Sequence, residues 1–388
     1  MGNVPNLRFP EFTEEWKETS LSSYAKKITK KNKGNIISNV LCNSANLGII
    51  PQSDYFDRDI ANNENTDAYY VIENGDFVYN PRKSVTAPYG PVNMYLGNKT
   101  GIISPLYLCF SVKDIYCDFL LHWFKGNAWH RYVYSHGDTG VRFDRVSIKD
   151  DIFLNMPIKV PVYEEQIRIS KLLRAIDERI ATQNKIIEDL KKLKSAIIDN
   201  CYSSKMNMVL LSELLKQCSW RNRNGLDLQV LSVSNKYGFI AQSDQFEDRE
   251  VASDDTSNYK VVEKGMFAYN PARINVGSIA LYEKDGKGIV SPMYVCFTTE
   301  RPLLPGYLKH YFASQAFRHE MYKRLEGSVR LCLTFEGLCN IEIPLPSIER
   351  QESISKYLST IENKVSLEEC VLSQYQLQRR HLLSQMFI

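Results

Sequence analysis

Two short stretches hold the side chains best suited to gripping a ligand, Tyr79-Asn80-Pro81 followed by Arg82 and Tyr269-Asn270-Pro271 followed by Ala272. Adenine methyltransferases hold a flipped base in a loop of the type Asn-Pro-Pro-aromatic, so this chemistry is tested first. Both stretches lack the second proline and the closing aromatic residue, and no glycine-rich loop follows a strand to hold a nucleoside cofactor. The sequence therefore does not support methyl transfer by this chain.

Other catalytic patterns are also missing from the sequence. The stretch LGNKTG at 96–101 lacks the glycine spacing of a phosphate-binding loop. No Cys-x-x-Cys pair occurs, and Cys109 and Cys296 fall in apolar runs, so buried free thiols are favoured over metal ligation. We find no nucleophile with an adjacent base. The histidines lack metal-ligand spacing and are expected to be core or surface residues: His122, His130, His136, His310, His319 and His381.

Both Tyr-Asn-Pro stretches belong to a repeat that runs through the whole chain. Gly48 and Tyr79 in the first half correspond to Gly238 and Tyr269 in the second, and the tripeptide QSD occurs at the same place in both halves. A repeat this long indicates a duplicated domain, because the periods of solenoid repeats are shorter. A duplicated domain usually creates a pseudo-twofold axis, so we expect two similar binding sites.

Each half begins with short β-branched and aromatic runs bounded by Gly, Pro and Asn, such as 74–80 and 264–270. These runs predict strands of a curled, antiparallel sheet. The aromatic segments 119–134 and 307–322 have helical spacing and predict one or two helices in each half, with core packing of the rings favoured over base stacking. Proline-punctuated extended stretches, MPIKVP and IEIPLP, then mark a boundary.

A heptad pattern follows each boundary and is the strongest periodic signal. Steps of four and three residues alternate, and even the polar interruptions coincide. Each helix would be about 54 Å long and needs a partner, so we expect the two helices to pair antiparallel. The positions are Ile169, Leu173, Ile176, Ile180, Gln183, Ile187, Leu190, Lys194 and Ile197, and then Ile354, Leu358, Ile361, Val365, Glu368, Leu372, Tyr375, Arg379 and Leu382.

The patterns together predict an α+β fold of two tandem, pseudo-twofold-related units. Each unit is expected to be a mixed or antiparallel β-rich domain followed by a long helix, and the two helices form an antiparallel coiled coil. The expected boundaries are 1–160 for the N-terminal segment and first domain, 161–203 for the first long helix, 204–347 for the second domain and 348–388 for the second long helix.

Composition limits the class of protein. The 388 residues are 44% hydrophobic, which suffices for two globular cores. Lys and Arg number 48 against 45 Asp and Glu, so any basic surface must arise from placement, and composition neither indicates nor excludes nucleic acid. The sequence shows no leader pattern and no apolar run long enough to cross a bilayer, so we expect a cytoplasmic protein without a membrane partner.

Four stretches carry a family resemblance: RFPEFTEEWKETSLSSYAKKI, PVYEEQIRISKLLRAIDERI, IPLPSIERQESISKYLSTIENKV and the ending LLSQMFI. Over essentially the whole chain they resemble the specificity subunit of a type I restriction-modification system. The first half carries Glu165-Gln166 as the family pattern expects, whereas the second carries Arg350-Gln351. This departure puts only a local interaction at the helix start in doubt.

The resemblance implies a fold and a set of partners. Two target recognition domains would alternate with the two long helices, and each domain would bind one half of a bipartite site on double-stranded DNA. The chain would be non-catalytic and would hold no cofactor or metal. It would dock two modification subunits, which methylate adenine using S-adenosylmethionine, and, in the full complex, two restriction subunits that use ATP and Mg.

A DNA-reading chain needs cations for phosphates and planar groups for base edges. We expect the DNA contacts in the Tyr-Asn-Pro turns and in the loops before Gly48 and Gly238. These loops differ between the halves, as recognition of two different half-sites requires. Whether each residue reads a base or lies in a plain surface turn stays open. The expected DNA-binding residues are Lys30, Lys31, Asn46, Asn80, Arg82, Lys83, Arg142, Arg145, Arg221, Arg223, Lys236, Asn270, Arg273 and Arg330.

Two other function classes stay open. A DNA methyltransferase or nuclease with an unrecognised site is one alternative, and cofactor binding by the isolated chain would reveal it. A purely structural coiled-coil scaffold is the other, although that role does not need two sheet-bearing domains with aromatic cores.

Overall fold

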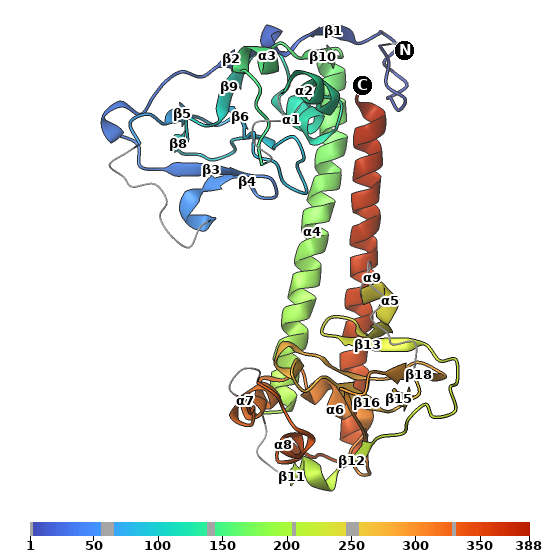
Figure 1. Ribbon diagram of the computed structural model, residues 1–388. Helices are drawn as coiled ribbons and strands as arrows, with labels where there is room; N and C mark the ends of the chain where they lie inside the picture. Colours follow the sequence, from blue (N-terminus) through green and yellow to red (C-terminus); the bar gives the residue numbers. More distant parts are fainter. Residues whose placement is uncertain (1–2, 56–65, 138–143, 204–206, 246–255, 328–330) are drawn as a thin grey trace. The chain divides into compact units, whose positions relative to one another are not determined.

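The computed structural model describes residues 3–55, 66–137, 144–203, 207–245, 256–327 and 331–388. The chain divides into two compact units, one formed by Met1–Gln183 with Val371–Ile388 and the other by Asn184–Cys370. The boundary crosses both long helices, α4 (Tyr163–Cys201) and α9 (Ile348–Met386), so each unit contains a stretch of each helix (Figure 1).

In the described residues of the first unit, the sheets have the strand orders β2-β9-β6-β7, β4-β3-β8-β5 and β1-β10. Strands β3 and β8 pair in parallel, and the other neighbours in these sheets are antiparallel. The strands are β1 (Lys17–Ser20), β2 (Ala25–Lys27), β3 (Val40–Ser44), β4 (Gly48–Pro51), β5 (Tyr70–Ile72), β6 (Phe77–Tyr79), β7 (Val92–Met94), β8 (Gly101–Ile103), β9 (Leu108–Val112) and β10 (Pro157–Val160).

The described part of the first unit also contains the short helices α1 (Cys117–Lys125), α2 (His130–His136) and α3 (Asp150–Leu154). Phe119 and Trp123 of α1 are buried in one core cluster with Phe77 and Phe110, whose rings stack with centroids 5.4 Å apart. Rings of this size bury large apolar areas and dominate the energy of a core. The preference for core packing of this aromatic segment is thus confirmed for Phe119 and Trp123.

The second unit has the strand orders β12-β19-β16-β17, β14-β13-β18-β15 and β11-β20, and β13 and β18 pair in parallel. Its strands are β11 (Met208–Leu210), β12 (Leu215–Cys218), β13 (Val230–Ser234), β14 (Gly238–Ala241), β15 (Lys260–Glu263), β16 (Phe267–Tyr269), β17 (Ile279–Leu281), β18 (Lys287–Val290), β19 (Val295–Thr299) and β20 (Glu342–Pro344). Its short helices are α5 (Gln242–Gln245), α6 (Pro305–Tyr311), α7 (Gln315–Lys323) and α8 (Phe335–Cys339).

The α+β class predicted from the sequence is confirmed, and so are the strands at 74–80 and 264–270 and the helices within 119–134 and 307–322. The sheets are mixed, which is one of the two arrangements expected, because β3 pairs with β8 and β13 pairs with β18 in parallel. Cys109 and Cys296 are buried free thiols, as predicted. Among the described residues, none of the helices combines the length and the hydrophobicity that a membrane span requires.

A buried glutamine near the start of each long helix ties that helix to its own unit. Gln166 accepts a hydrogen bond from the Tyr116 backbone N–H at 2.8 Å, just before α1. Gln351 accepts one from the Leu304 N–H at 2.9 Å, just before α6. Each bond satisfies an N–H that the short helix itself leaves unpaired. The departure at Arg350 therefore leaves the glutamine contact intact.

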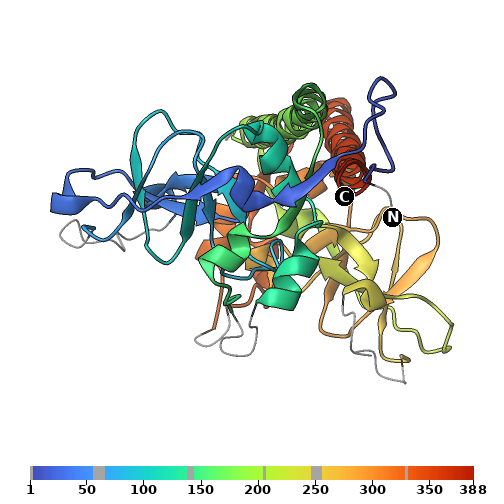
Figure 2. The ribbon, with the colours of Figure 1, turned by 90° about the horizontal axis from the view of Figure 1, so that it is seen from above.

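The N-terminal segment of the first unit lies beside the C-terminal end of α9 (Figure 2). The Leu7 N–H donates to the Gln385 carbonyl at 3.0 Å. Arg8 makes two hydrogen bonds of 2.7 Å to the two carboxylate oxygens of Glu165 on α4. The Glu165 side chain is fully buried and that of Arg8 is 10% exposed, so this forked ion pair lies inside the unit.

Charged clusters join the long helices and the short helices within each unit. In the first unit, Asp177 of α4 forms an ion pair with Arg379 of α9 and lies 3.9 Å from Nδ1 of His122 on α1. In the second unit, Glu362 of α9 pairs with Lys194 of α4 at 2.7 Å and with Lys309 of α6 at 3.2 Å. Each carboxylate therefore links three helices of its unit.

Candidate nucleic-acid interface

The β3–β4 and β13–β14 turns have the same internal bracing. The Ser44 hydroxyl accepts hydrogen bonds from the N–H groups of Asn46 and Leu47, and Ser234 does the same for Lys236 and Tyr237. Ser side chains commonly brace turns in this way. Asn46 and Lys236, both expected to bind DNA, thus occupy the tips of fixed hairpins.

The asparagines of the Tyr-Asn-Pro turns hold the turn itself. The Asn80 side-chain oxygen accepts from the Arg82 N–H at 3.0 Å, and Asn270 accepts from the Ala272 N–H at 3.1 Å. Asn270 is only 8% exposed. In both turns the bracing fixes the direction in which the cation after the proline, Arg82 or Arg273, leaves the backbone.

The first unit brings four of the expected residues together. Thr86, from the loop after the Tyr-Asn-Pro turn, donates to the Asn46 side-chain oxygen at 3.0 Å. The backbones of Arg82 and Arg145 pair as an isolated β-bridge, and the Lys83 N–H donates to the Asp144 carbonyl next to Arg145. Asn46, Arg82, Lys83 and Arg145 therefore gather on one part of the surface.

A second set of expected cations lies at a different edge. The backbone of Lys31 bridges to Tyr70 of β5, and its ammonium group lies 3.3 Å from the centroid of the Tyr70 ring. In the order β4-β3-β8-β5, this edge is opposite the β4 hairpin. Arg221 bridges in the same way to Lys260 of β15 and donates to Asn258. Lys30 and Arg223 are exposed beside them.

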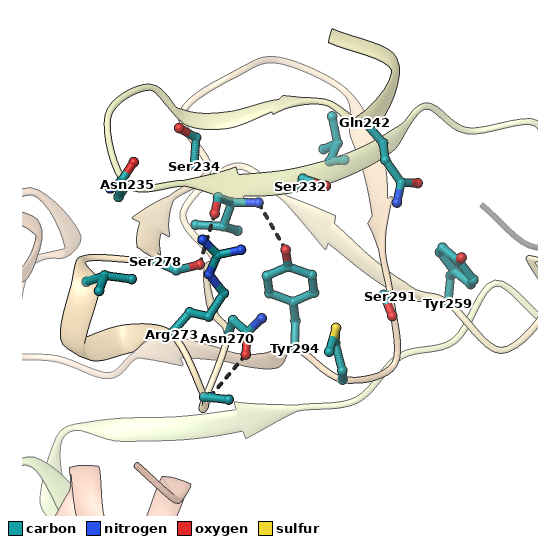
Figure 3. Close-up of a pocket in the computed structure, with 15 residues that line it drawn as sticks. Ser232, Ser234, Asn235, Gln242, Tyr259, Asn270, Arg273, Ser278, Ser291 and Tyr294 are labelled. Atoms are coloured by element: carbon teal, nitrogen blue, oxygen red, sulfur yellow. Dashed lines mark hydrogen bonds between the residues drawn. The ribbon is translucent and has the colours of Figure 1, made fainter. Parts of the chain in front are cut away.

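The second unit has a hollow of about 560 Å³ at its Tyr-Asn-Pro turn, and Figure 3 shows the side chains that line it. Arg273 extends into it from the turn toward β13. The Tyr294 hydroxyl accepts from the Val233 N–H, and the Ser278 hydroxyl donates to the Val233 carbonyl, so these groups are already engaged. Arg273 is exposed and supplies the cation of this hollow.

Gln242 lines the same hollow and was not among the residues expected to bind DNA. Its side-chain oxygen is buried and has no hydrogen-bond partner in the described part of the chain. The repeated tripeptide QSD marks this position in the sequence. The repeat alone, however, does not distinguish a glutamine with a structural role from one whose side chain lacks a hydrogen-bond partner.

The other residues expected to bind DNA lie outside these two groups and outside the hollow at the second Tyr-Asn-Pro turn. Lys236 lies 4.8 Å from the ring of Tyr237 and lines a separate hollow of about 610 Å³ that also includes Lys191 and Lys194. Arg142 and Arg330 lie outside the described residues. Within the ranges that the structure describes, no group of three or more His, Cys, Asp or Glu could hold a metal ion.

The two histidines that correspond between the halves are neutral groups of the interior. Burial lowers the pKa of His122 and of His310 to about 4, although each faces a carboxylate. Both side chains are at most 6% exposed. Of the two places expected for the histidines, core or surface, these two therefore occupy the core.

Comparison with known proteins supports the family resemblance. Residues 230–374 match the family described as type I restriction modification DNA specificity domain. The chain is 25% identical over 315 residues to the type I restriction enzyme MjaVIII specificity subunit of Methanocaldococcus jannaschii, covering 70% of this chain and 67% of that protein.

Two solved structures share the fold at low sequence identity. One is the type I restriction-modification S subunit from M. genitalium, with a TM-score of 0.57, 13% identity and 99% of each chain covered. The other comes from work on complex assembly and conformational transition of the type I R-M system, with a TM-score of 0.56, 15% identity, and 96% of this chain and 97% of that chain covered. The matched domain, the curated relative and the shared fold all agree with the resemblance of this chain to type I restriction-modification specificity subunits.

Proposed function

We propose that this chain is the DNA-recognition subunit of a type I restriction-modification enzyme and does no chemistry itself. The observation that carries the proposal is the repeated Tyr-Asn-Pro turn, which in both halves is braced by its own asparagine and followed by an exposed arginine. Guanidinium groups and side-chain amides are the groups that read base edges in the major groove. Each half would read one half of a bipartite target, with 1–160 and 204–347 as the recognition domains.

We further propose that α4 and α9 pair antiparallel as a coiled coil and that this coiled coil sets the distance between the two recognition domains. The ion pairs between the helices support an antiparallel arrangement. Asp177 of α4 pairs with Arg379 of α9, whereas Lys194, further along α4, pairs with Glu362, which comes earlier in α9. Equivalent seam positions Leu173 and Leu358 are buried. The glutamine bonds and the charged clusters fix each domain to its stretch of helix, so a change of helix length would move the domains.

The partners in this proposal are two modification subunits, docked on the helices, and two restriction subunits in the full complex. S-adenosylmethionine would belong to the modification subunits, and ATP and Mg to the restriction subunits. The rival proposal of a methyltransferase or nuclease with an unrecognised site makes a different prediction for the isolated chain.

Methylation assays separate these proposals. The purified chain, its cognate modification subunit and the mixture of the two are each incubated with genomic DNA and S-adenosylmethionine, and methylated adenines are mapped by sequencing. We expect methylation at one bipartite sequence in the mixture and none with the chain alone. Methyl transfer by the chain alone would support the enzyme, and a sequence pattern that does not depend on this chain would remove it from recognition.

Replacement of Arg273 by alanine tests the head in the second unit. We expect specific binding to weaken by about 1–3 kcal/mol, with discrimination lost at one base pair, if the guanidinium contacts a guanine edge through two hydrogen bonds. A phosphate contact would instead weaken binding to all sequences and lower its salt dependence. The control is Lys264→Ala, which removes an exposed cation paired with Asp285. Equal affinities of wild type and variant would exclude Arg273 from the interface.

A further inference from the structure

The first unit contains a basic hollow that includes none of the residues expected above to bind DNA. It has a volume of about 430 Å³ and lies between the α1–α2 turn and the last turns of α9. No carboxylate is among the described residues that line it. Its polar lining consists of Lys125, Asn127, His130, Arg380, His381 and Ser384.

The second half of the chain shows that the fold does not require this charge. The heptad seam matches Arg379 with Lys194, and the aromatic segments match His122 with His310. The corresponding residues in the second half are small and uncharged, with Ala313 for Lys125, Ser195 for Arg380 and Ala196 for His381. The second half forms corresponding helices without these charges, so Arg380 and His381 are not required to form the fold, whereas Lys125 also donates to the buried Asn93.

Hydrogen bonds connect the hollow to the Tyr-Asn-Pro turn of the same unit. The Lys125 ammonium group donates to the Asn93 side-chain oxygen at 2.5 Å. Asn93 donates to the Asn43 side-chain oxygen at 2.6 Å, and Asn80 of the turn donates to the Asn43 carbonyl at 3.1 Å. Asn43 and Asn93 are at most 5% exposed, and buried, fully paired amides hold their neighbours in fixed positions.

A ring contact makes a second connection. His130, which lines the hollow, lies with its ring centroid 4.8 Å from that of Tyr89. Tyr89 in turn accepts a hydrogen bond at its carbonyl from the Tyr79 hydroxyl. The hollow is therefore next to the loop that carries Arg82 and Lys83, which are expected to contact DNA.

We propose that this hollow binds a phosphate of the DNA backbone beside the first half-site, with Arg380, His381 and Lys125 as its donors. The proposal rests on the DNA-recognition function proposed above. A guanidinium group binds phosphate oxygens through two parallel hydrogen bonds, and the ammonium group adds a point charge. DNA is favoured over an acidic segment of a partner protein because the hollow is tied to the turn that would face the half-site.

The test uses the complex of this chain with its cognate modification subunit and measures DNA affinity over a series of salt concentrations. The variants are Arg380→Ser and Arg380→Ser with His381→Ala, which introduce residues that the second half already carries at these positions. The control is Lys171→Ser, which also removes an exposed cation from a long helix of this unit. The logarithm of the DNA association constant falls linearly with the logarithm of the salt concentration, and we expect this negative slope to be about 1 less steep in the double variant. Cognate and unrelated duplexes should be weakened by the same factor, and the control should match wild type.

Each other outcome has a defined meaning. An unchanged slope together with weaker assembly with the modification subunit would overturn the proposal in favour of an acidic protein segment. An unchanged slope with normal assembly would show that no phosphate is bound in the hollow. Loss of discrimination at one base pair would also overturn it, because a phosphate contact carries no sequence information. If the wild-type complex showed no sequence preference, the proposed function would be wrong. A change of salt dependence in the double variant would still show that the hollow binds a phosphate.

Discussion

Replacement of Arg8 by alanine is expected to lower the free energy of unfolding by about 3–5 kcal/mol. The reason is that Glu165 is fully buried and its two carboxylate oxygens both accept from Arg8. Hydrogen bonding to Glu165 raises the pKa of Arg8, so the guanidinium group stays charged. Removal of the guanidinium group leaves a buried carboxylate without a counter-ion. Denaturant unfolding followed by tryptophan fluorescence measures the change, since Trp16 and Trp123 are buried in the same core cluster.

Two further variants isolate the cause of this loss. Arg168→Ala breaks the ion pair with Glu11 and should leave the free energy of unfolding close to that of wild type, because the two side chains are 60% and 45% exposed. Arg8→Met combined with Glu165→Leu removes both charges and should recover most of the lost stability, because no unpaired charge remains. A loss below about 1 kcal/mol for Arg8→Ala alone would show that water reaches Glu165.

The repeat in the sequence made much of the fold predictable. Strand and helix periodicities occur twice, so each element is supported by two independent stretches, and β6 and β16 lie where 74–80 and 264–270 indicate. Parallel pairing of β3 with β8 was not predictable. An alternating strand pattern specifies which face is buried but not the direction of a neighbour about sixty residues away.

Positions of side chains in the candidate site were only partly predictable. The Tyr-Asn-Pro spacing indicated where cations leave the backbone, but not that Asn80 and Asn270 would be used to brace the turn. The basic hollow had no sequence signal of its own, because Lys125 and Arg380 are 255 positions apart and become neighbours only through tertiary packing. The difference between Lys125 and Ala313 became informative only when the structure placed Lys125 at the end of α1 and Ala313 in the turn just after α6.

Addition of one heptad to each long helix, after Gln183 and after Glu368, is expected to abolish tight binding to the original DNA site. The insertions lie within two residues of the boundary between the two units, so the ion pairs of Asp177 with Arg379 and of Lys194 with Glu362 are preserved. Seven residues lengthen a helix by about 10.5 Å and keep a heptad seam facing its partner. The variant should therefore fold and still assemble with modification subunits.

The loss of binding follows from the geometry of DNA. Two heads on one face of a duplex place their half-site centres about one turn apart, roughly 34 Å or 10 base pairs. An added 10.5 Å corresponds to about three base pairs, which also rotate one half-site by roughly 100° around the duplex. In sites with a spacer longer by three base pairs, the half-sites would lie at the right distance, but one of them would face away from its recognition domain. Such sites should therefore not restore tight binding. An insertion in one helix alone should be worse, because the antiparallel partners no longer match in length. Binding to duplexes with a panel of spacer lengths measures these effects, and an unchanged preference of the doubly lengthened variant for the original spacer would show that the helices do not set the distance.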